Sequence, residues 1–360
     1  MGVPLLEGVM TILLISDDDR TALACNLLAD QLRMRGQTCL TAGLPLDPKR
    51  ESPFPLSRPQ IMLSLEALLT SSLLEQASSL GVFLQDPEKL GQFIASHRTL
   101  AAHSRRAAAP VFSGPLQASL GDSLMKQLYH HLDCDLLLLP GERQLQDVSA
   151  ITQHWPAGSP PPRLLATGLW FMPERPTTGS LNGGKPTPPH HLLALVQDAV
   201  PSAPGGKSQF LRQLMQWAEA SPDWTVVVQR DDSWERGRNW IPRFKPEEWS
   251  LPDNLDFAAP GQLLSQLASC SACVTVSSPW AMTAMAWGRK TMLVGDYGIH
   301  TNEGTTSWFG CGNMHRLHSI QQLDQLLELP NSNQSWLESM GWGIHDGVDR
   351  LIKALEELTA

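Results

Sequence analysis

The chain has 360 residues, of which 42% are hydrophobic and 18% are charged, and its formal net charge is -9. This length allows two domains of ordinary size with cores of their own, so neither disulfides nor a structural metal are needed for stability. The negative charge argues against a nucleic-acid partner, because a phosphate backbone is bound by clustered Lys and Arg.

The N-terminal stretch MGVPLLEGVMTILLIS has no basic segment and contains Glu7 and Gly8. We therefore expect neither a signal peptide nor a membrane anchor there, and no later stretch is long and apolar enough to form an integral membrane segment. Six scattered cysteines suggest a reducing compartment, so a cytoplasmic location is expected. Cys270 and Cys273 form a C-x-x-C pair, but no second pair completes a zinc site, so we interpret them as buried thiols and expect no metal.

The first half begins with an apolar strand at 11–15, the sequence SDDDR, a helical pattern at 21–35 and a second strand at 38–41. This order is typical of a βαβ unit with an acidic loop at the carboxyl end of its first strand. Strands and helices continue to alternate after a Pro-rich loop at 45–59. We expect strands at 82–84, 110–112, 135–139 and 164–169, and helices at 63–80 and 86–97.

The composition changes at PERPTTGSLNGGKPTPP, which is typical of a linker or long surface loop. The αβ alternation then resumes. We expect strands at 192–196, 224–229, 255–258, 273–276 and 291–294, helices at 207–220, 262–270 and from 279 onward, and a final amphipathic helix at 344–358. The pattern predicts two α/β, Rossmann-like domains facing a central cleft. The expected boundaries are 1–172, a linker at 173–190, a second domain at 191–335, and a C-terminal helix at 336–360 that packs on the first domain.

Residues 273–298 predict a strand that ends at Ser277 and Ser278 and a helix that begins at Pro279. Proline suits the first helical position, which makes Ser278 the N-cap. Two hydroxyls and free backbone N–H groups at the carboxyl edge of a parallel sheet are suited to binding phosphate. The alternative is that Ser278 only caps the helix and Ser277 only fills the turn.

Polar residues gather at the predicted strand ends, whereas the common nucleotide and hydrolase motifs G-x-G-x-x-G, the P-loop lysine motif and G-x-S-x-G are absent. Acidic groups in the first domain and donors in the second fit transfer of a group from a nucleotide-activated donor. The candidates in the first domain are Asp17, Asp18, Asp19, Arg20, Ser113 and Gly114, and those in the second are Gln197, Gln229, Arg230, Gly261, Ser277, Ser278 and Asp296.

The segments SDDDR, PVFSGP and DLLLLPGERQ in the first half resemble a bacterial glycosyltransferase family that is largely uncharacterised. ASPDWTVVVQR, LPDNLDF, VTVSSPWAMTAMAWGRKTMLVGDYGI and FGCG in the second half resemble the same family. The strand that ends in Ser-Ser before A-x-x-A-x-x-x-G is more distantly similar to bacterial sialyltransferases and polysialyltransferases, whose serine pair is taken to hold the donor's phosphate. The resemblance implies the two-domain GT-B glycosyltransferase fold.

The chain departs from this resemblance at the end of its VVV strand, where Gln229 replaces the expected lysine and the RDDSWERGRNW segment lacks an expected Thr-His pair. Thr283 occupies the helix position that usually carries a glutamate for the donor's ribose or base. A different donor, weak donor binding or loss of catalysis would each account for these changes.

The resemblance implies that Asp18 is the general base for the acceptor hydroxyl, because its position matches the family's acidic loop. The alternative is that the aspartates cap the following helix, with Asp19 well placed to do so. Ser277, Ser278 and the backbone N–H groups of the helix that they open would stabilise the leaving phosphate. Arg230 would either neutralise a phosphate or be solvated. Gly114 and Gly261 would allow close approach of a ligand, and Arg20 would bind substrate or pair with the acids.

Three hypotheses follow. The first is a metal-independent glycosyltransferase that needs no cofactor, with a nucleotide sugar as donor and a glycan or small molecule as acceptor. The second is a catalytically silent relative that keeps only a binding surface, as suggested by Gln229 and Thr283. The third is an enzyme of the same fold with different chemistry, such as a nucleotide-sugar epimerase or a glycerophosphate-type transferase.

Overall fold

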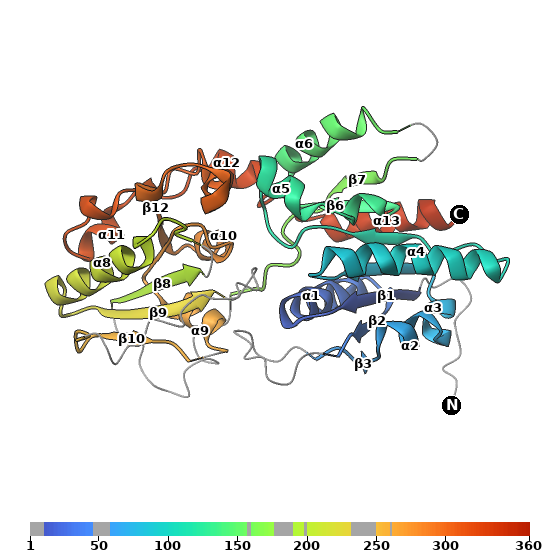
Figure 1. Ribbon diagram of the computed structural model, residues 1–360, viewed down its shortest axis with the longest axis horizontal. Coiled ribbons are helices and arrows are strands. Elements are labelled where there is room, and N and C mark those ends of the chain that lie inside the picture. The colour runs from blue at the N-terminus through green and yellow to red at the C-terminus, as the bar shows by residue number, and fades with distance from the viewer. Residues whose placement is uncertain are drawn as a thin grey trace. The chain divides into compact units, whose positions relative to one another are not determined.

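In a computed structural model, residues 11–45, 58–156, 160–175, 190–197, 200–231, 250–259 and 261–360 are described. The chain divides into two compact units, one built from the described residues up to 173 together with 338–360, and the other from those between 174 and 337. Each unit contains one parallel sheet with helices packed on it, so the predicted α/β class with two Rossmann-like domains is confirmed (Figure 1).

The first unit has a seven-stranded sheet in the order β3-β2-β1-β4-β5-β6-β7, and all its neighbouring strands are parallel. Its elements are β1 (Thr11–Ser16), α1 (Asp19–Met34), β2 (Thr38–Gly43), β3 (Ile61–Met62), α2 (Leu65–Leu69), α3 (Ser72–Gln76), β4 (Ser79–Phe83), α4 (Pro87–His103), β5 (Val111–Ser113), α5 (Gly121–Gln127), η1 (His131–Asp133), β6 (Leu136–Leu139), α6 (Glu142–Thr152), β7 (Arg163–Ala166) and α13 (Gly347–Thr359).

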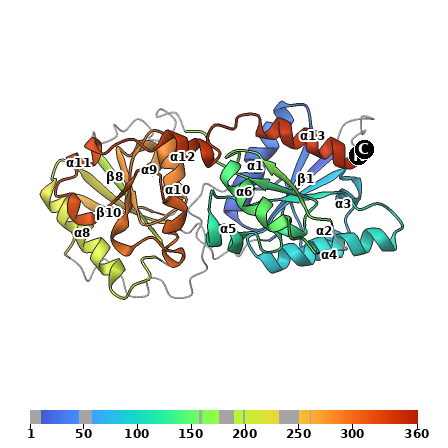
Figure 2. The same cartoon turned by 90° about the horizontal axis from the view of Figure 1, so that it is seen from above.

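Strand β1 has apolar side chains on both faces, as expected for the centre of a parallel sheet. Ile12 and Leu14 lie in the core beneath α1 and α13, whereas Leu13 and Ile15 lie in the core beneath α4. Figure 2 shows α1 and α13 on one side of this sheet and α4 on the other. Each fully buried Leu or Ile contributes about 1.5–3 kcal/mol, so both faces stabilise the strand.

The C-terminal helix α13 belongs to the first unit by its contacts as well as by its apolar face. Leu351 and Leu355 are buried in the same core as α1. At the rim, the Arg35 guanidinium donates to both carboxylate oxygens of Asp349, over 2.6 and 3.1 Å. The last helix therefore completes the covering of a sheet whose first strand lies more than three hundred residues earlier in the sequence.

The second unit has a six-stranded sheet in the order β10-β9-β8-β11-β12-β13, again with parallel neighbours. Its elements are β8 (His191–Gln197), α8 (Gly206–Ala220), β9 (Thr225–Asp231), β10 (Leu255–Phe257), α9 (Leu263–Ser269), β11 (Ala272–Thr275), α10 (Trp280–Ala286), β12 (Lys290–Val294), η3 (Gly295–Tyr297), η4 (Thr301–Glu303), η5 (Thr305–Trp308), β13 (Met314–His315), η6 (Leu317–Ser319) and α11 (Asp324–Glu328), and α12 (Gln334–Ser339) crosses the division between the units.

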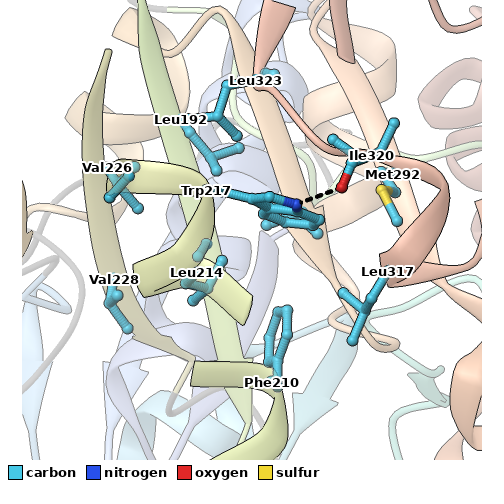
Figure 3. Packing of buried hydrophobic residues seen from close by; sticks show 14 of the residues in the cluster. Leu192, Phe210, Leu214, Trp217, Val226, Val228, Met292, Leu317, Ile320 and Leu323 are labelled. Carbon is cyan, nitrogen blue, oxygen red and sulfur yellow. Dashed lines mark hydrogen bonds between the residues drawn. The ribbon is translucent and has the colours of Figure 1, made fainter. Parts of the chain in front are cut away.

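The core of the second unit is arranged around Trp217 of α8, which is 1% exposed. Its indole N–H donates to the Ile320 carbonyl oxygen over 2.7 Å, while Leu214 and Phe210 of the same helix pack beside it (Figure 3). Because a buried indole N–H needs a partner, this bond fixes the 317–323 segment against α8.

Two parts of the expected element pattern need comment. The predicted helix at 63–80 is wrong: Ser64 and Ser71 each cap a separate short helix, and Ser79 already begins β4. Most of the Pro-rich loop, the linker run and the RDDSWERGRNW segment lie outside the described residues. None of the helices that the structure describes combines the length and apolar character needed to cross a bilayer.

Candidate functional site

The second sheet reverses its strand order between β8 and β11. From β8 the chain continues to β9 on one side, and it later returns to β11 on the other side. In open parallel sheets, ligands bind beyond the carboxyl ends of the strands at such a switch point. The residues that follow these two ends therefore define the candidate site.

Gln197 and Ser277 meet at this switch point. The Ser277 backbone N–H donates to Gln197 Oε1 over 3.0 Å. The Ser277 hydroxyl lies 3.2 Å from the same oxygen and also within hydrogen-bonding distance of the Glu303 carbonyl oxygen. The structure thus brings together Gln197 and Ser277, two residues selected from the sequence. Both donors of Ser277 are hydrogen-bonded to other parts of the chain.

Ser278 is fully buried, and the predicted helix start is off by one residue. Helix α10 begins at Trp280, with Pro279 rather than Ser278 as the residue before it. The Ser278 carbonyl oxygen accepts from the Ala281 N–H over 3.0 Å, which forms a tight turn ahead of the helix. Its Oγ accepts from the Trp280 N–H over 3.2 Å, so the hydroxyl still satisfies one of the first helical donors.

Glu303 is a site residue that the sequence pattern did not reveal. Its side chain is only 2% exposed, and its carboxylate accepts from the Ser202 backbone N–H over 2.9 and 3.2 Å and from the Ser202 hydroxyl. The surrounding HTNEGT run has no apolar period, so it predicts a loop and gives no sign of a buried acid. Glu303, which follows β12, thus contacts the loop after β8 through its carboxylate and the loop after β11 through its carbonyl oxygen.

The other candidates of the second unit lie at or near strand ends. Gln229 on β9 is 2% exposed; its Nε2 donates to the Arg230 carbonyl oxygen, and its Oε1 has no hydrogen-bond partner among the described residues. The Arg230 side chain is exposed. Thr283 is buried in α10. Asp296 accepts from the Leu317 N–H over 2.7 Å, which anchors the loop after β12 to the chain itself.

Gly261 adopts a φ of +81°, the left-handed region where glycine is unstrained, and it lies just before Gln262, the N-cap of α9. A turn with this backbone conformation is sufficient to explain why the residue is glycine. Its predicted role in close approach of a ligand stays a prediction.

The first sheet has its own switch point between β1 and β4, where Asp17 is held. Asp17 Oδ1 accepts from the Gln85 N–H over 2.8 Å, while Asp17 Oδ2 is buried without a hydrogen-bond partner in the described part of the chain. Burial raises the pKa of Asp17, and the neighbouring Asp18 carboxylate adds to that effect. This carboxyl group is thus more easily protonated than an exposed one.

Asp18, and not Asp19, is the N-cap of α1. Its Oδ1 accepts from the Thr21 N–H over 2.7 Å, and the Thr21 hydroxyl lies 3.0 Å from the Asp18 N–H, which completes a capping box. The alternative that the aspartates cap the helix thus holds for Asp18, while Asp19 lies in the first turn of α1, where an acid favours the helix dipole. The capping role does not test whether Asp18 also acts as a base.

Ser113 at the end of β5 is hydrogen-bonded within the first unit, and Gly114 directly after it lies close to strand β6. Ser113 is fully buried; its hydroxyl donates to the Val82 carbonyl oxygen, so His131 Nδ1, 2.9 Å away, is the donor in their contact. Burial lowers the pKa of His131 to about 4. A Cβ at Gly114 would lie 2.1 Å from the Leu138 carbonyl oxygen, so glycine is required here by the neighbouring strand.

Arg20 donates through its guanidinium to the Leu116 carbonyl oxygen over 2.7 Å. This contact ties α1 to the segment that follows β5 in the same unit. Its predicted part in substrate binding stays untested.

All six cysteines are free and buried, which confirms the interpretation of the C-x-x-C pair as buried thiols. Burial raises the pKa of Cys270 to about 12. Among the residues that the structure describes, no group of three or more His, Cys, Asp and Glu side chains is placed to hold a metal ion.

The fold has solved counterparts. A protein from Listeria monocytogenes described as a "putative UDP-N-acetylglucosamine 2-epimerase" matches with a TM-score of 0.63 and 10% identity, covering 98% of this chain and 96% of its own. The UDP-GlcNAc 2-epimerase from Neisseria meningitidis, solved with UDP-GlcNAc, matches with a TM-score of 0.59 and 12% identity, covering 97% and 100%. The glycotransferase of kitacinnamycin matches with a TM-score of 0.52 and 13% identity, covering 98% of each chain.

At these identities the structural likeness establishes the fold alone, which is the GT-B type with two Rossmann-like domains. No curated protein matches the chain significantly. A family model described as "Putative glycosyltransferase (DUF6716)" matches residues 89–358, which is three quarters of the chain. The chain therefore belongs to this glycosyltransferase family.

Proposed function

We propose that the protein transfers a sugar from a nucleotide-activated donor to a hydroxyl group of an acceptor, without a metal ion. The observation that carries this proposal is the hydrogen-bonded pair Gln197 and Ser277 at the switch point of the second sheet. A polar cluster at that position suits a ligand with several acceptor oxygens, such as the phosphates of a nucleotide sugar.

In the proposed reaction, the acceptor oxygen attacks the anomeric carbon of the donor and the bond from that carbon to the phosphate oxygen breaks. The nucleotide leaves with the electron pair, and the hydroxyl groups of Ser277 and Ser278 stabilise its phosphate. The acceptor proton passes to a carboxylate of the first unit. Asp18 is the proposed base, and Asp17 is a second candidate because its Oδ2 has no partner within the described residues.

The donor is proposed from two sources. The epimerase from Neisseria meningitidis was solved with UDP-GlcNAc, which makes UDP the first nucleotide to test. The similarity of the serine pair to sialyltransferases makes CMP the second. Gln229 and Thr283, where the resemblance implies lysine and glutamate, are expected to change the contacts to the base or ribose.

The experiment is a thermal-shift titration of the protein with UDP, CMP, GDP and ADP, with EDTA present throughout. One nucleotide should raise the unfolding midpoint in a saturable way, because a ligand that binds only the folded state stabilises it. Ser277→Ala and Gln197→Ala should reduce the shift. Ser319→Ala is the matched control, since Ser319 is an exposed serine of the same unit. An absent shift for every nucleotide would favour the silent-relative hypothesis.

A further inference from the structure

The loop after β8 presents two hydrogen-bond donors to one buried carboxylate. Both oxygens of Glu303 accept from the Ser202 N–H, and Glu303 Oε1 also accepts from the Ser202 hydroxyl. Ser202 itself is exposed, whereas Glu303 is 2% exposed. The donors of Ser202 are therefore reachable from solvent once the carboxylate is removed.

A buried carboxylate is costly unless donors or cations compensate for its lost hydration. In the described part of the chain, the Glu303 carboxylate has no Lys or Arg within ion-pair distance, and Ser202 supplies all of its hydrogen bonds. Charge-assisted bonds of this kind are the strong ones. Ser202 thus offers two donors to a negatively charged oxygen, and the Glu303 carboxylate occupies both.

The Glu303 carbonyl oxygen also accepts a hydrogen bond from the Ser277 hydroxyl. Displacement of Glu303 would release three donors together: the Ser202 N–H, the Ser202 hydroxyl and the Ser277 hydroxyl. Gly304 directly follows Glu303 and Gly298 lies five residues before it, with φ of +68° and +82°, conformations that other residues rarely adopt. The loop that carries Glu303 is therefore built around glycine turns.

The geometry points to an oxyanion site at Ser202 and Ser277 that Glu303 fills and that a phosphate or diphosphate group takes over when it displaces Glu303. A diphosphate offers several acceptor oxygens for the three released donors and carries the charge that the site already accommodates. This inference rests on the proposed function only in naming a nucleotide diphosphate as the natural ligand. The site itself is testable with inorganic pyrophosphate.

The first test compares pyrophosphate binding by isothermal titration calorimetry, without divalent cations, for the full-length protein and its variants. Glu303→Gln keeps an acceptor for Ser202 but removes the competing charge, so it should bind at least about tenfold more tightly than the wild type. Adding Ser202→Ala to that variant removes the hydroxyl donor and leaves the backbone N–H, so it should reduce the gain. Glu328→Gln is the matched control, because Glu328 is an exposed glutamate of the same unit.

Equal affinity of the wild type and Glu303→Gln, no binding by either, or a gain that Ser202→Ala leaves undiminished would each overturn the inference. A second test uses the wild type alone, in case Glu303→Gln does not fold. Pyrophosphate should increase amide hydrogen exchange in residues 298–308 as Glu303 is released, and unchanged or slower exchange there would contradict the inference.

The outcomes separate this inference from the proposed function. If Glu303→Gln gains affinity through Ser202 but no nucleotide sugar is consumed, the oxyanion site stands and sugar transfer falls. If sugar is transferred but Glu303→Gln gains no affinity for pyrophosphate, sugar transfer stands and the oxyanion site falls.

Discussion

At the scale of single residues, each acid of the SDDDR run has a different environment. Asp18 caps α1 through Thr21, whereas Asp17 accepts from Gln85 and keeps one buried oxygen without a partner in the described part of the chain. Pattern alone does not distinguish Asp17 from its neighbours, because its environment depends on Gln85, 68 residues later in the sequence. The structure assigns the cap, and mutation is needed to assign the base.

The two roles of Asp18 can be separated by substitution. Asp18→Ala removes the acceptor for the Thr21 N–H and should cost about 1 kcal/mol of unfolding free energy. Asp18→Asn keeps an acceptor, so its stability in urea should stay near that of the wild type. If Asp18 is the base, Asp18→Asn should nevertheless lose sugar transfer. Retained transfer in Asp18→Asn would limit Asp18 to capping.

The raised pKa of Asp17 predicts that the stability of the protein depends on pH. Because its pKa in the folded state is raised above the ordinary value of 3.8, the group favours folding below that pH, and this contribution is lost as the pH rises through the folded-state pKa. Asp17→Asn should therefore become more stable relative to the wild type between acidic and neutral pH. Urea denaturation across that range measures the change, with the exposed Asp223→Asn as control. A constant difference would contradict the raised pKa.

At the scale of elements, the sequence predicted most strands because each is a short apolar run bounded by polar or glycine residues. It failed at 63–80, where apolar residues continue across two serine caps and into β4. It also left Glu303 unnoticed, since the burial of a loop residue depends on contacts to the distant Ser202 and not on local periodicity. Local serine caps account for the first miss, and a long-range contact accounts for the second.

The amphipathic pattern of α13 leads to a test of its packing on the first sheet. Leu355 is fully buried against that core, whereas Leu358 on the same helix is 37% exposed. Leu355→Ala should cost about 2–5 kcal/mol, because it removes buried methyl groups and leaves a cavity. Leu358→Ala should change stability by less than about 0.5 kcal/mol. Similar effects of both substitutions on chemical denaturation would contradict the observed packing.

At the scale of the whole molecule, both sheets place polar side chains at their switch points, with Asp17 in the first and Gln197 and Ser277 in the second. Asp17 is an acid, whereas Ser277 donates its backbone N–H to the Gln197 side chain. The family match and the GT-B fold support the proposed sugar transfer.

The central claim is tested most directly by the product. The protein would be incubated with UDP-GlcNAc or a CMP-linked sugar and a panel of glycan and small-molecule acceptors, and the mixture followed by NMR, alongside Ser277→Ala and the control Ser319→Ala. The account predicts a new glycoside, or free sugar where water is the acceptor, together with released nucleotide, and loss of both in Ser277→Ala. An isomerised donor, a phosphodiester or an unchanged mixture would contradict it.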